Sequence, residues 1–510
     1  MPADLVLVSE LDYAPERPTN TFMEFYSKPL RRLNLPRLPH PQQLGVVALG
    51  TYLRQKGIEV QIFDNVLRMP GPRQALFQAL DQQPPAVGIS TSLLINPESV
   101  RCLADWIRER CPRTCLILGG AGAAFIPEMR QFADIVVLGD GEQTALELIQ
   151  ALGRRSSLEN IPNLLIRRGD NWLGTPRRSN ISVDEIPPPD WDLLATRASR
   201  CHGIEASKGC RYNCVFCTYE GRADQRMKSI DLVAAEIRRN HDLYGIDLYR
   251  FADANLTSWP EQTEALCEAI ISLGIPIRWG CYARLDNFAR RPGLAQKMRS
   301  AGCVAVYSGI ESGSDFILRK MRKGYNVSHL REGMRWLKEE NIHAHGNFII
   351  GFPGETRSTV DEMLALIDEL ALDTVSFFSL AVAPYSDMWD LKASYGLEGS
   401  NIRWRHATMD SDEAQSLVDY STETVCMKMS HPLIGDEHRM VYNYLGNGLS
   451  LSQGRECMRA FRDFYRSQCL ADTRLGQESL GRIKSYYDLI LEDLKTRVKD
   501  IQSASPEEVS

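Results

Sequence analysis

Short apolar runs alternate with helical spacing of apolar residues along the first 150 residues. In segment 44–56 the apolar positions Val46, Leu49 and Leu53 predict a helix that ends at Gly57. The pattern predicts strands at 5–8, 59–64, 86–92, 114–119 and 135–138, with helices at 44–56, 73–80, 98–110, 127–132 and 142–152. Strands that alternate with helices favour a doubly wound parallel sheet, an α/β fold whose ligands bind outside the carboxyl ends of the strands.

The next segment, residues 153–200, is predicted to be a linker. Apolar residues at 164–166 and near Trp172 flank Gly169-Asp170, a dipeptide typical of hairpin turns, and this pattern predicts a hairpin. Three prolines at 187–189 then predict a stiff, extended connection.

A second alternating series occupies residues 201–390. Its predicted strands are 204–206, 248–252, 276–282, 304–310, 343–350 and 374–380, with helices at 230–244, 261–273, 294–301, 328–339 and 357–370. Six strands with helices between them suit a partial (β/α)6 barrel, since a complete eight-unit barrel typically needs about 250 residues. Barrel chemistry takes place at the carboxyl ends of the strands, so functional residues are expected there.

The remaining residues, 391–510, have few glycines and predict a helical region. Leu480, Ile483, Tyr487, Ile490 and Leu494 lie on one face of an amphipathic helix, which predicts a buried stripe. Aromatic and histidine side chains in or just before this region are candidates either to close the barrel mouth or simply to pack; they are Trp389, Trp404, His406, His431, Tyr442 and Tyr444. Residues 503–510 suggest a disordered tail.

The long insertion at 11–41 connects the first strand to its helix and is a candidate to cap a ligand site. The predicted organisation is thus a first domain at 1–152, the linker at 153–200, a barrel at 201–390 and a helical region at 391–510.

Composition describes an ordinary globular protein. Of 510 residues, 44% are hydrophobic and 24% charged, and the net charge of -6 gives no bulk affinity for nucleic acid. No apolar run approaches the ~20 residues that span a bilayer, and the N-terminus lacks a basic-then-apolar signal, so a cytoplasmic location is expected. Thirteen cysteines are too sparse for a disulfide scaffold in a chain of this size.

Three of these cysteines lie in one polar loop, where Cys210, Cys214 and Cys217 form a C-x3-C-x2-C triplet. Thiols so close together predict a metal site. A structural zinc requires four protein ligands, and the next cysteine downstream is only Cys267. Three ligands instead favour a four-iron four-sulfur cluster with one iron left open. Three unrelated buried cysteines are the structural alternative.

With Phe216 just before its last cysteine, the triplet resembles the signature of the radical S-adenosylmethionine (SAM) enzymes. This resemblance implies that the amino and carboxylate groups of SAM chelate the open iron. It also implies that an electron from the cluster cleaves SAM to a 5'-deoxyadenosyl radical, and that a partner such as flavodoxin or ferredoxin supplies the electron.

Four strand ends downstream resemble the same family. They are Phe-Ala-Asp-Ala-Asn at 251–255, Trp-Gly-Cys-Tyr-Ala-Arg at 279–284, Gly-Ile-Glu-Ser-Gly at 309–313 and Phe-Ile-Ile-Gly-Phe-Pro-Gly-Glu at 348–355. The resemblance implies that Asp253, Arg284 and Glu311 contact SAM or its neighbourhood, and that Phe216 and Ile350 pack on its adenine. A charge paired with a barrel neighbour is the alternative for each of the three ionic residues.

The strand ends of the first domain carry hydroxyl side chains and glycines, whose backbone a ligand can approach closely. Composition alone leaves its glycines as ordinary turn residues, but their order resembles the cobalamin-binding domain that precedes many radical SAM cores. By that resemblance the residues facing the corrin or its nucleotide tail are Ser90, Thr91, Gly119, Gly120, Gly139, Gly141 and Glu142. The Asp-x-His-x-x-Gly motif that supplies a cobalt ligand in the best-known cobalamin domains is absent, so no axial ligand is assigned.

Together these resemblances imply a cobalamin-dependent radical SAM enzyme with a cluster, SAM and cobalamin as cofactors. We expect a methyltransferase acting on an unactivated carbon of a small molecule such as a secondary metabolite, a cofactor or a lipid, with methylcobalamin as the methyl donor. The alternatives are a ring cyclase or ring-contracting enzyme on the same scaffold, and a non-catalytic cobalamin-binding module. No catalytic residue and no substrate are assigned from the sequence.

Overall fold

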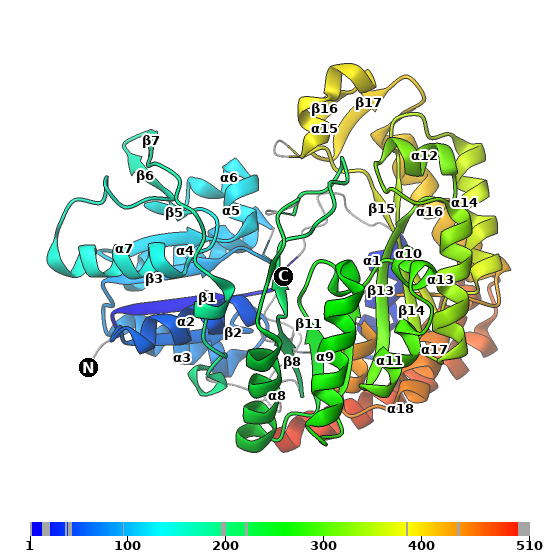
Figure 1. Cartoon of the computed structure of the whole chain (residues 1–510), viewed down its shortest axis with the longest axis horizontal. Coiled ribbons are helices and arrows are strands. Elements are labelled where there is room, and N and C mark those ends of the chain that lie inside the picture. The colour runs from blue at the N-terminus through cyan, green and yellow to red at the C-terminus, as the bar shows by residue number, and fades with distance from the viewer. Residues whose placement is uncertain are drawn as a thin grey trace. The chain divides into compact units, whose positions relative to one another are not determined.

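The structure of the chain is a computed structural model. It describes residues 3–12, 21–35, 38, 43–94, 96–194, 200–219, 223–383, 386–435 and 439–497. The described residues fall into two compact units. The first holds those within 3–12, 38–194 and 494–497, and the second holds 21–35 and those within 200–493 (Figure 1).

The first unit is built on a seven-stranded sheet with the order β2-β1-β3-β4-β5-β6-β7. Five strands are parallel: β1 (Leu5–Ser9), β2 (Val60–Asp64), β3 (Ala86–Ser90), β4 (Cys115–Gly119) and β5 (Ile135–Val137). The helices of this unit are α2 (Leu44–Gln55), α3 (Pro70–Asp81), α4 (Pro97–Arg110), α5 (Ala121–Phe125), α6 (Pro127–Arg130) and α7 (Glu142–Arg154). This confirms the predicted doubly wound sheet, with the flavodoxin-like order 2-1-3-4-5 and its switch point between β1 and β3.

The predicted hairpin is present, but it belongs to the first sheet and not to a free linker. Strands β6 (Leu164–Arg168) and β7 (Asn171–Gly174) pair across Gly169-Asp170, and β6 also pairs antiparallel with β5. The sheet therefore ends in a two-stranded antiparallel edge.

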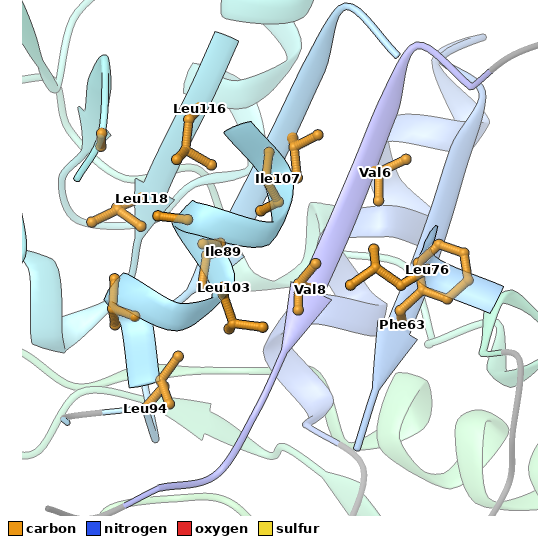
Figure 2. Packing of buried hydrophobic residues seen from close by; sticks show 14 of the residues in the cluster. Val6, Val8, Phe63, Leu76, Ile89, Leu94, Leu103, Ile107, Leu116 and Leu118 are labelled. Atoms are coloured by element: carbon orange, nitrogen blue, oxygen red, sulfur yellow. The ribbon is translucent and has the colours of Figure 1, made fainter. Parts of the chain in front are cut away.

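One face of this sheet is covered by a layer of buried apolar side chains. Figure 2 shows Leu103 and Ile107 of α4 lying over Val8 of β1 and Ile89 of β3, and all four are at most 1% exposed. Fully burying side chains of this kind is worth about 1.5 to 3 kcal/mol each. This packing fixes the strand ends on which any ligand site of the unit must be built.

The second unit contains a parallel sheet with the order β19-β15-β14-β13-β12-β11-β8. Its strands are β8 (Cys201–Ile204), β11 (Leu248–Phe251), β12 (Arg278–Tyr282), β13 (Cys303–Glu311), β14 (His343–Ile350), β15 (Thr374–Ser379) and β19 (Leu433–Ile434). The main helices between the first six are α8 (Ile230–Tyr244), α9 (Pro260–Ser272), α10 (Leu285–Arg290), α11 (Leu294–Ser300), α12 (Asp315–Lys320), α13 (Val327–Glu339) and α14 (Arg357–Leu370). The first strand covers Cys201–Ile204, so it begins earlier than predicted and ends at the first residue of the predicted range, 204–206.

The region after residue 390 is helical, as predicted, but not throughout. It holds α16 (Ser411–Lys428), α17 (Leu451–Cys469) and α18 (Thr473–Arg497), and it also forms a three-stranded antiparallel sheet and contributes β19 to the barrel. The small sheet consists of β16 (Glu398–Ser400), β17 (Arg403–His406) and β18 (Met409–Asp410). Four residues of the predicted stripe on α18 are buried, namely Ile483, Tyr487, Ile490 and Leu494, while Leu480 is only partly buried.

The described part of the 11–41 insertion includes helix α1 (Thr21–Arg32), which belongs to the second unit. There the Tyr26 ring packs at a tilt against Phe461 of α17, with ring centroids 4.8 Å apart, and the Tyr26 hydroxyl donates to the carbonyl of Ile434. This segment is thus part of the core of the second unit. Most of the rest of the insertion, and the predicted tail at 503–510, lie outside the described residues. Of the described helices, none is long and apolar enough to cross a bilayer.

Candidate functional site

The cysteine loop follows β8 and is fastened to the barrel at its middle. The buried Val215 donates its backbone N–H to the carbonyl of Met321 at 3.1 Å, and its carbonyl accepts from the N–H of Met388 at 2.9 Å. Between the cysteines, the Cys217 N–H donates to the Cys214 carbonyl at 3.1 Å in a tight turn. These hydrogen bonds tie the loop to neighbouring segments at the carboxyl end of the first strand.

All three thiols are free and only partly buried, so they are available as ligands. Burial raises the pKa of the Cys210 and Cys217 thiols, and the Lys323 ammonium opposes that rise at both. Among the described residues, no three His, Cys, Asp or Glu side chains converge on one point that would hold a single ion. Such convergence is not required for a four-iron cluster, because each cysteine binds a different iron. The donor set fits a cluster with one open iron.

Asp253, which follows β11, uses both carboxylate oxygens within the protein. Oδ2 accepts from the N–H of Ala206 at 3.1 Å and Oδ1 accepts from the hydroxyl of Ser207 at 2.6 Å. Its side chain is fully buried, and burial raises its pKa to about 6. The contacts of Asp253 thus hold the segment that leads into the cysteine loop.

Arg284, which follows β12, joins the cysteine loop to the loop after α12. Its guanidinium lies 3.8 Å from the ring centroid of Tyr212, pairs with Asp286 at 2.9 Å and donates to the carbonyl of Lys323. Its third nitrogen group, Nη1, is buried without a hydrogen-bond partner among the described residues. An unpaired buried donor is costly, so it marks a position where a ligand acceptor would fit.

Glu311 ends β13 in a strained conformation, beside a cation that the sequence did not single out. Its φ of 71° lies in the left-handed region, at a point where the register of β13 and β14 shifts. Oε1 accepts from Nζ of the buried Lys323 at 3.2 Å, and the same ammonium donates to the carbonyl of Gly309 at 2.9 Å. Strain of this kind costs of order 1–3 kcal/mol and is concentrated at functional sites.

The Gly-Phe-Pro-Gly-Glu turn after β14 is closed by its own glutamate. The fully buried Glu355 accepts with Oε2 from the N–H groups of Gly351 and Phe352, and Oε1 has no hydrogen-bond partner among the described residues. Of the two isoleucines before the turn, Ile350 is fully buried and Ile349 is partly exposed. Ile349 is therefore the one whose side chain a ligand can reach, and Phe216 in the cysteine loop is partly exposed as well.

Burial raises the pKa of Glu355 to about 7, which predicts a specific pH dependence of stability. The folded protein holds this proton up to a higher pH than the unfolded chain does. The contribution of Glu355 to the free energy of unfolding should therefore fall by about 3 kcal/mol between about pH 4.5 and 7, and it should stay constant above pH 7. We expect Glu355→Gln to lack this slope. Thermal unfolding between pH 5 and 8 measures the difference, with Glu362→Gln on the exposed side of α14 as control; parallel curves for wild type and Glu355→Gln would contradict it.

A polar network on β14 and β15 fixes the orientation of a half-buried amide. Ser376 donates its hydroxyl proton to the carbonyl of Gly435, and its oxygen lies 3.4 Å from Nε2 of His345, an arrangement that suits the tautomer with a proton on Nε2. That Nε2–H also donates to Oδ1 of Asn347 at 2.9 Å. The Asn347 amide nitrogen is then the group left to donate to a bound molecule.

In the first unit, some residues at the strand ends hold the loops together through hydrogen bonds or close packing, and others have no atoms close to them. Thr91 is fully buried, and its hydroxyl donates to the Gly119 carbonyl and accepts from the Ala123 N–H. A side chain at Gly120 would strike Ser92, whereas a Cβ at Gly119 would meet nothing within 4 Å. Thr91 and Gly120 therefore form the loop itself, and Gly119 leaves open space above the sheet.

The remaining predicted residues of this unit also lie at carboxyl strand ends. Ser90 ends β3 and is partly exposed, Gly139 adopts a positive φ of 72°, and a Cβ at Gly141 would come no closer than 3.9 Å to Val137. Glu142 is buried in the first turn of α7, where the helix dipole stabilises a carboxylate. An open backbone surface beside a helix N-terminus fits a bulky ligand with an amide-rich or phosphate-bearing periphery.

Two family models match the chain. The radical SAM superfamily matches residues 204–367, which include the cysteine loop, and the B12 binding domain matches residues 38–149. An uncharacterized methyltransferase of Pyrococcus horikoshii is 31% identical over 356 residues, covering 67% of this chain and 76% of the relative. The chain belongs to the radical SAM enzymes that carry a B12 binding domain. Its cofactors are accordingly a four-iron four-sulfur cluster, SAM and cobalamin.

Two further similarities bear on this family. The anaerobic magnesium-protoporphyrin IX monomethyl ester cyclase of Synechocystis is 27% identical over 363 residues, covering 68% of this chain and 72% of the cyclase. Among solved structures, the radical SAM methyltransferase TsrM from Kitasatospora setae has a TM-score of 0.63 at 16% identity, covering 96% of this chain and 99% of TsrM. The structural likeness confirms the fold predicted from the sequence.

Proposed function

We propose that this radical SAM enzyme is a cobalamin-dependent methyltransferase that methylates an unactivated carbon of a small molecule. The observation that carries the proposal is the loop of three free thiols at the end of β8, in a chain that also has a B12 binding domain. The similarity to the P. horikoshii methyltransferase supports methyl transfer. When bound, the cluster supplies an electron to SAM and cobalamin supplies a methyl group.

The described contacts suggest what each residue contributes. We assign Cys210, Cys214 and Cys217 as cluster ligands. Unpaired Nη1 of Arg284 and the carboxylate of Glu311 are proposed to bind the polar groups of SAM. Phe216 and the partly exposed Ile349, in place of the buried Ile350, are proposed to provide apolar contact for adenine. Asp253 acts as a positioning residue for the cysteine loop through Ala206 and Ser207.

For cobalamin, we propose that Gly119 and Gly141 give the corrin or its tail close access to the backbone, with Ser90, Gly139 and Glu142 around them. Thr91 and Gly120 hold the loops beside these residues in place, Thr91 through its hydrogen bonds and Gly120 through its close packing on Ser92. We propose Asn347 as a donor to the substrate, because its amide orientation is fixed by His345. A low-potential donor such as flavodoxin or ferredoxin is the proposed reductant, and the net charge of -6 argues against a nucleic acid substrate.

The test uses SAM whose methyl group carries carbon-13 and deuterium. Reduced, cobalamin-loaded full-length protein is incubated with small-molecule extracts, and products are analysed by mass spectrometry and NMR. Methylation predicts a product with one labelled methyl group on carbon. Consumption of SAM with products that carry no label would favour the second candidate, a cyclase-type reaction, which the similarity to the Synechocystis enzyme supports.

The role of Glu311 can be tested separately from the reaction. A charge-assisted hydrogen bond to SAM is worth roughly 1.5 to 3 kcal/mol, so Glu311→Gln should weaken SAM binding by about ten- to 150-fold. Calorimetry on reconstituted protein measures the affinity, with Glu332→Gln on the exposed side of α13 as control. Because Glu311 also pairs with Lys323, some loss of thermal stability is expected. A less stable protein with unchanged SAM affinity would show that the carboxylate serves Lys323 alone.

A further inference from the structure

Lys323 is a buried cation beside the cysteine loop. It lies between α12 and α13, is 4% exposed, and its Nζ is 5.7 Å from the ring centroid of Phe216. The ammonium interacts electrostatically with all three thiols of the loop, Cys210, Cys214 and Cys217. A charge excluded from water is screened far less by salt than a surface charge, so the ammonium acts on this loop at ordinary ionic strength.

The ammonium is also fixed in place. The Lys323 carbonyl accepts from the Arg284 guanidinium, and two residues earlier the Met321 carbonyl accepts from the N–H of Val215 in the cysteine loop. At its other end, Nζ donates to the carbonyl of Gly309 and to Glu311. The distance between this charge and the thiols is therefore set by the fold and not by a mobile side chain.

We propose that Lys323 sets the reduction potential of the cluster. A cluster held by three thiolates gains one more negative charge when it accepts an electron, and a fixed cation nearby stabilises that reduced form over the oxidised form. The Glu311 carboxylate, paired with Lys323 at 3.2 Å, acts in the opposite direction. This inference rests on the proposed ligation by Cys210, Cys214 and Cys217, and it concerns the cluster before SAM binds.

The experiment is a redox titration of reconstituted full-length protein without SAM, followed by electron paramagnetic resonance of the reduced cluster. At the wild-type midpoint, Lys323→Gln should lower the ratio of reduced to oxidised cluster by about tenfold, which is about 59 mV for a one-electron couple. Lys323→Arg, which keeps the charge, should remain within about twofold of wild type. Lys320→Gln, which removes a partly exposed neighbouring charge, is the matched control and should change the ratio little.

If Lys323→Gln binds its cluster poorly, the same question can be answered by a double-mutant cycle that combines Lys323→Gln with Glu311→Gln. Glu311→Gln should move the ratio in the opposite direction, and the double variant should return toward wild type. Variants of Lys323 and Glu311 that hold the cluster with an unchanged midpoint would overturn the inference while leaving the proposed function intact. A wild-type protein that binds no cluster would overturn both.

Discussion

Replacing Cys214 with alanine is expected to abolish the iron–sulfur cluster and, with it, SAM binding at the open iron. Three thiols are available on this loop, and a cluster that already has one open iron has no spare protein ligand. Iron and sulfide content, together with the visible absorbance of the reconstituted protein, should fall to background. The same result is expected for Cys210→Ala and Cys217→Ala.

The control for this experiment is Cys469→Ser, which changes an exposed cysteine at the end of α17. It should keep full iron content and thermal stability. A Cys214→Ala protein that still holds a cluster whose spectrum responds to SAM would refute the assignment of the loop. Loss of the cluster together with the fold would be uninformative in Cys214→Ala, so circular dichroism of each variant accompanies the iron assay.

Replacing Gly119 with leucine is expected to lower cobalamin affinity by at least about 100-fold without unfolding the protein. A Cβ at this position meets no atom within 4 Å and the backbone is not in the left-handed region, so the fold tolerates a side chain. A leucine side chain would occupy the open space above the end of β4 and exclude a ligand that packs on bare backbone. Cobalamin retained through gel filtration measures the effect.

Gly153→Leu provides the matched control, since it adds the same side chain at an exposed position of α7 with equally free space. It should retain cobalamin like wild type. Gly119→Leu protein that binds cobalamin as tightly as Gly153→Leu would place the corrin away from the end of β4. It would then remove Gly119 from the proposed site without affecting the radical SAM part of the account.

Most of the architecture could be predicted because its elements are long and periodic. The parallel strands of both sheets follow apolar runs, and the α18 stripe follows the helical period. The elements that were missed are very short: β19 has two residues and β16 to β18 have two to four, too few to show a period. The assignment of the 164–174 hairpin to the first sheet depends on its pairing with β5, a contact that local sequence does not encode.

The site was predictable where its signal is local and was missed where it is not. Cysteine spacing alone indicates a cluster loop, because all three ligands come from one segment. Lys323 could not be predicted from local sequence, because its role depends on contacts with Glu311 and Phe216, which lie elsewhere in the chain. Which isoleucine of the 349–350 pair is accessible depends on strand register, since neighbouring residues point to opposite faces.

SAM is expected to bind directly at the cluster held by Cys210, Cys214 and Cys217. The most direct test is electron paramagnetic resonance of the reduced, full-length wild-type protein, recorded with and without saturating SAM. If SAM chelates the open iron, its addition changes the spectrum of the reduced cluster, and methyl-labelled SAM shows magnetic coupling to it. Identical spectra with and without SAM, from protein that contains a complete cluster, would contradict the account.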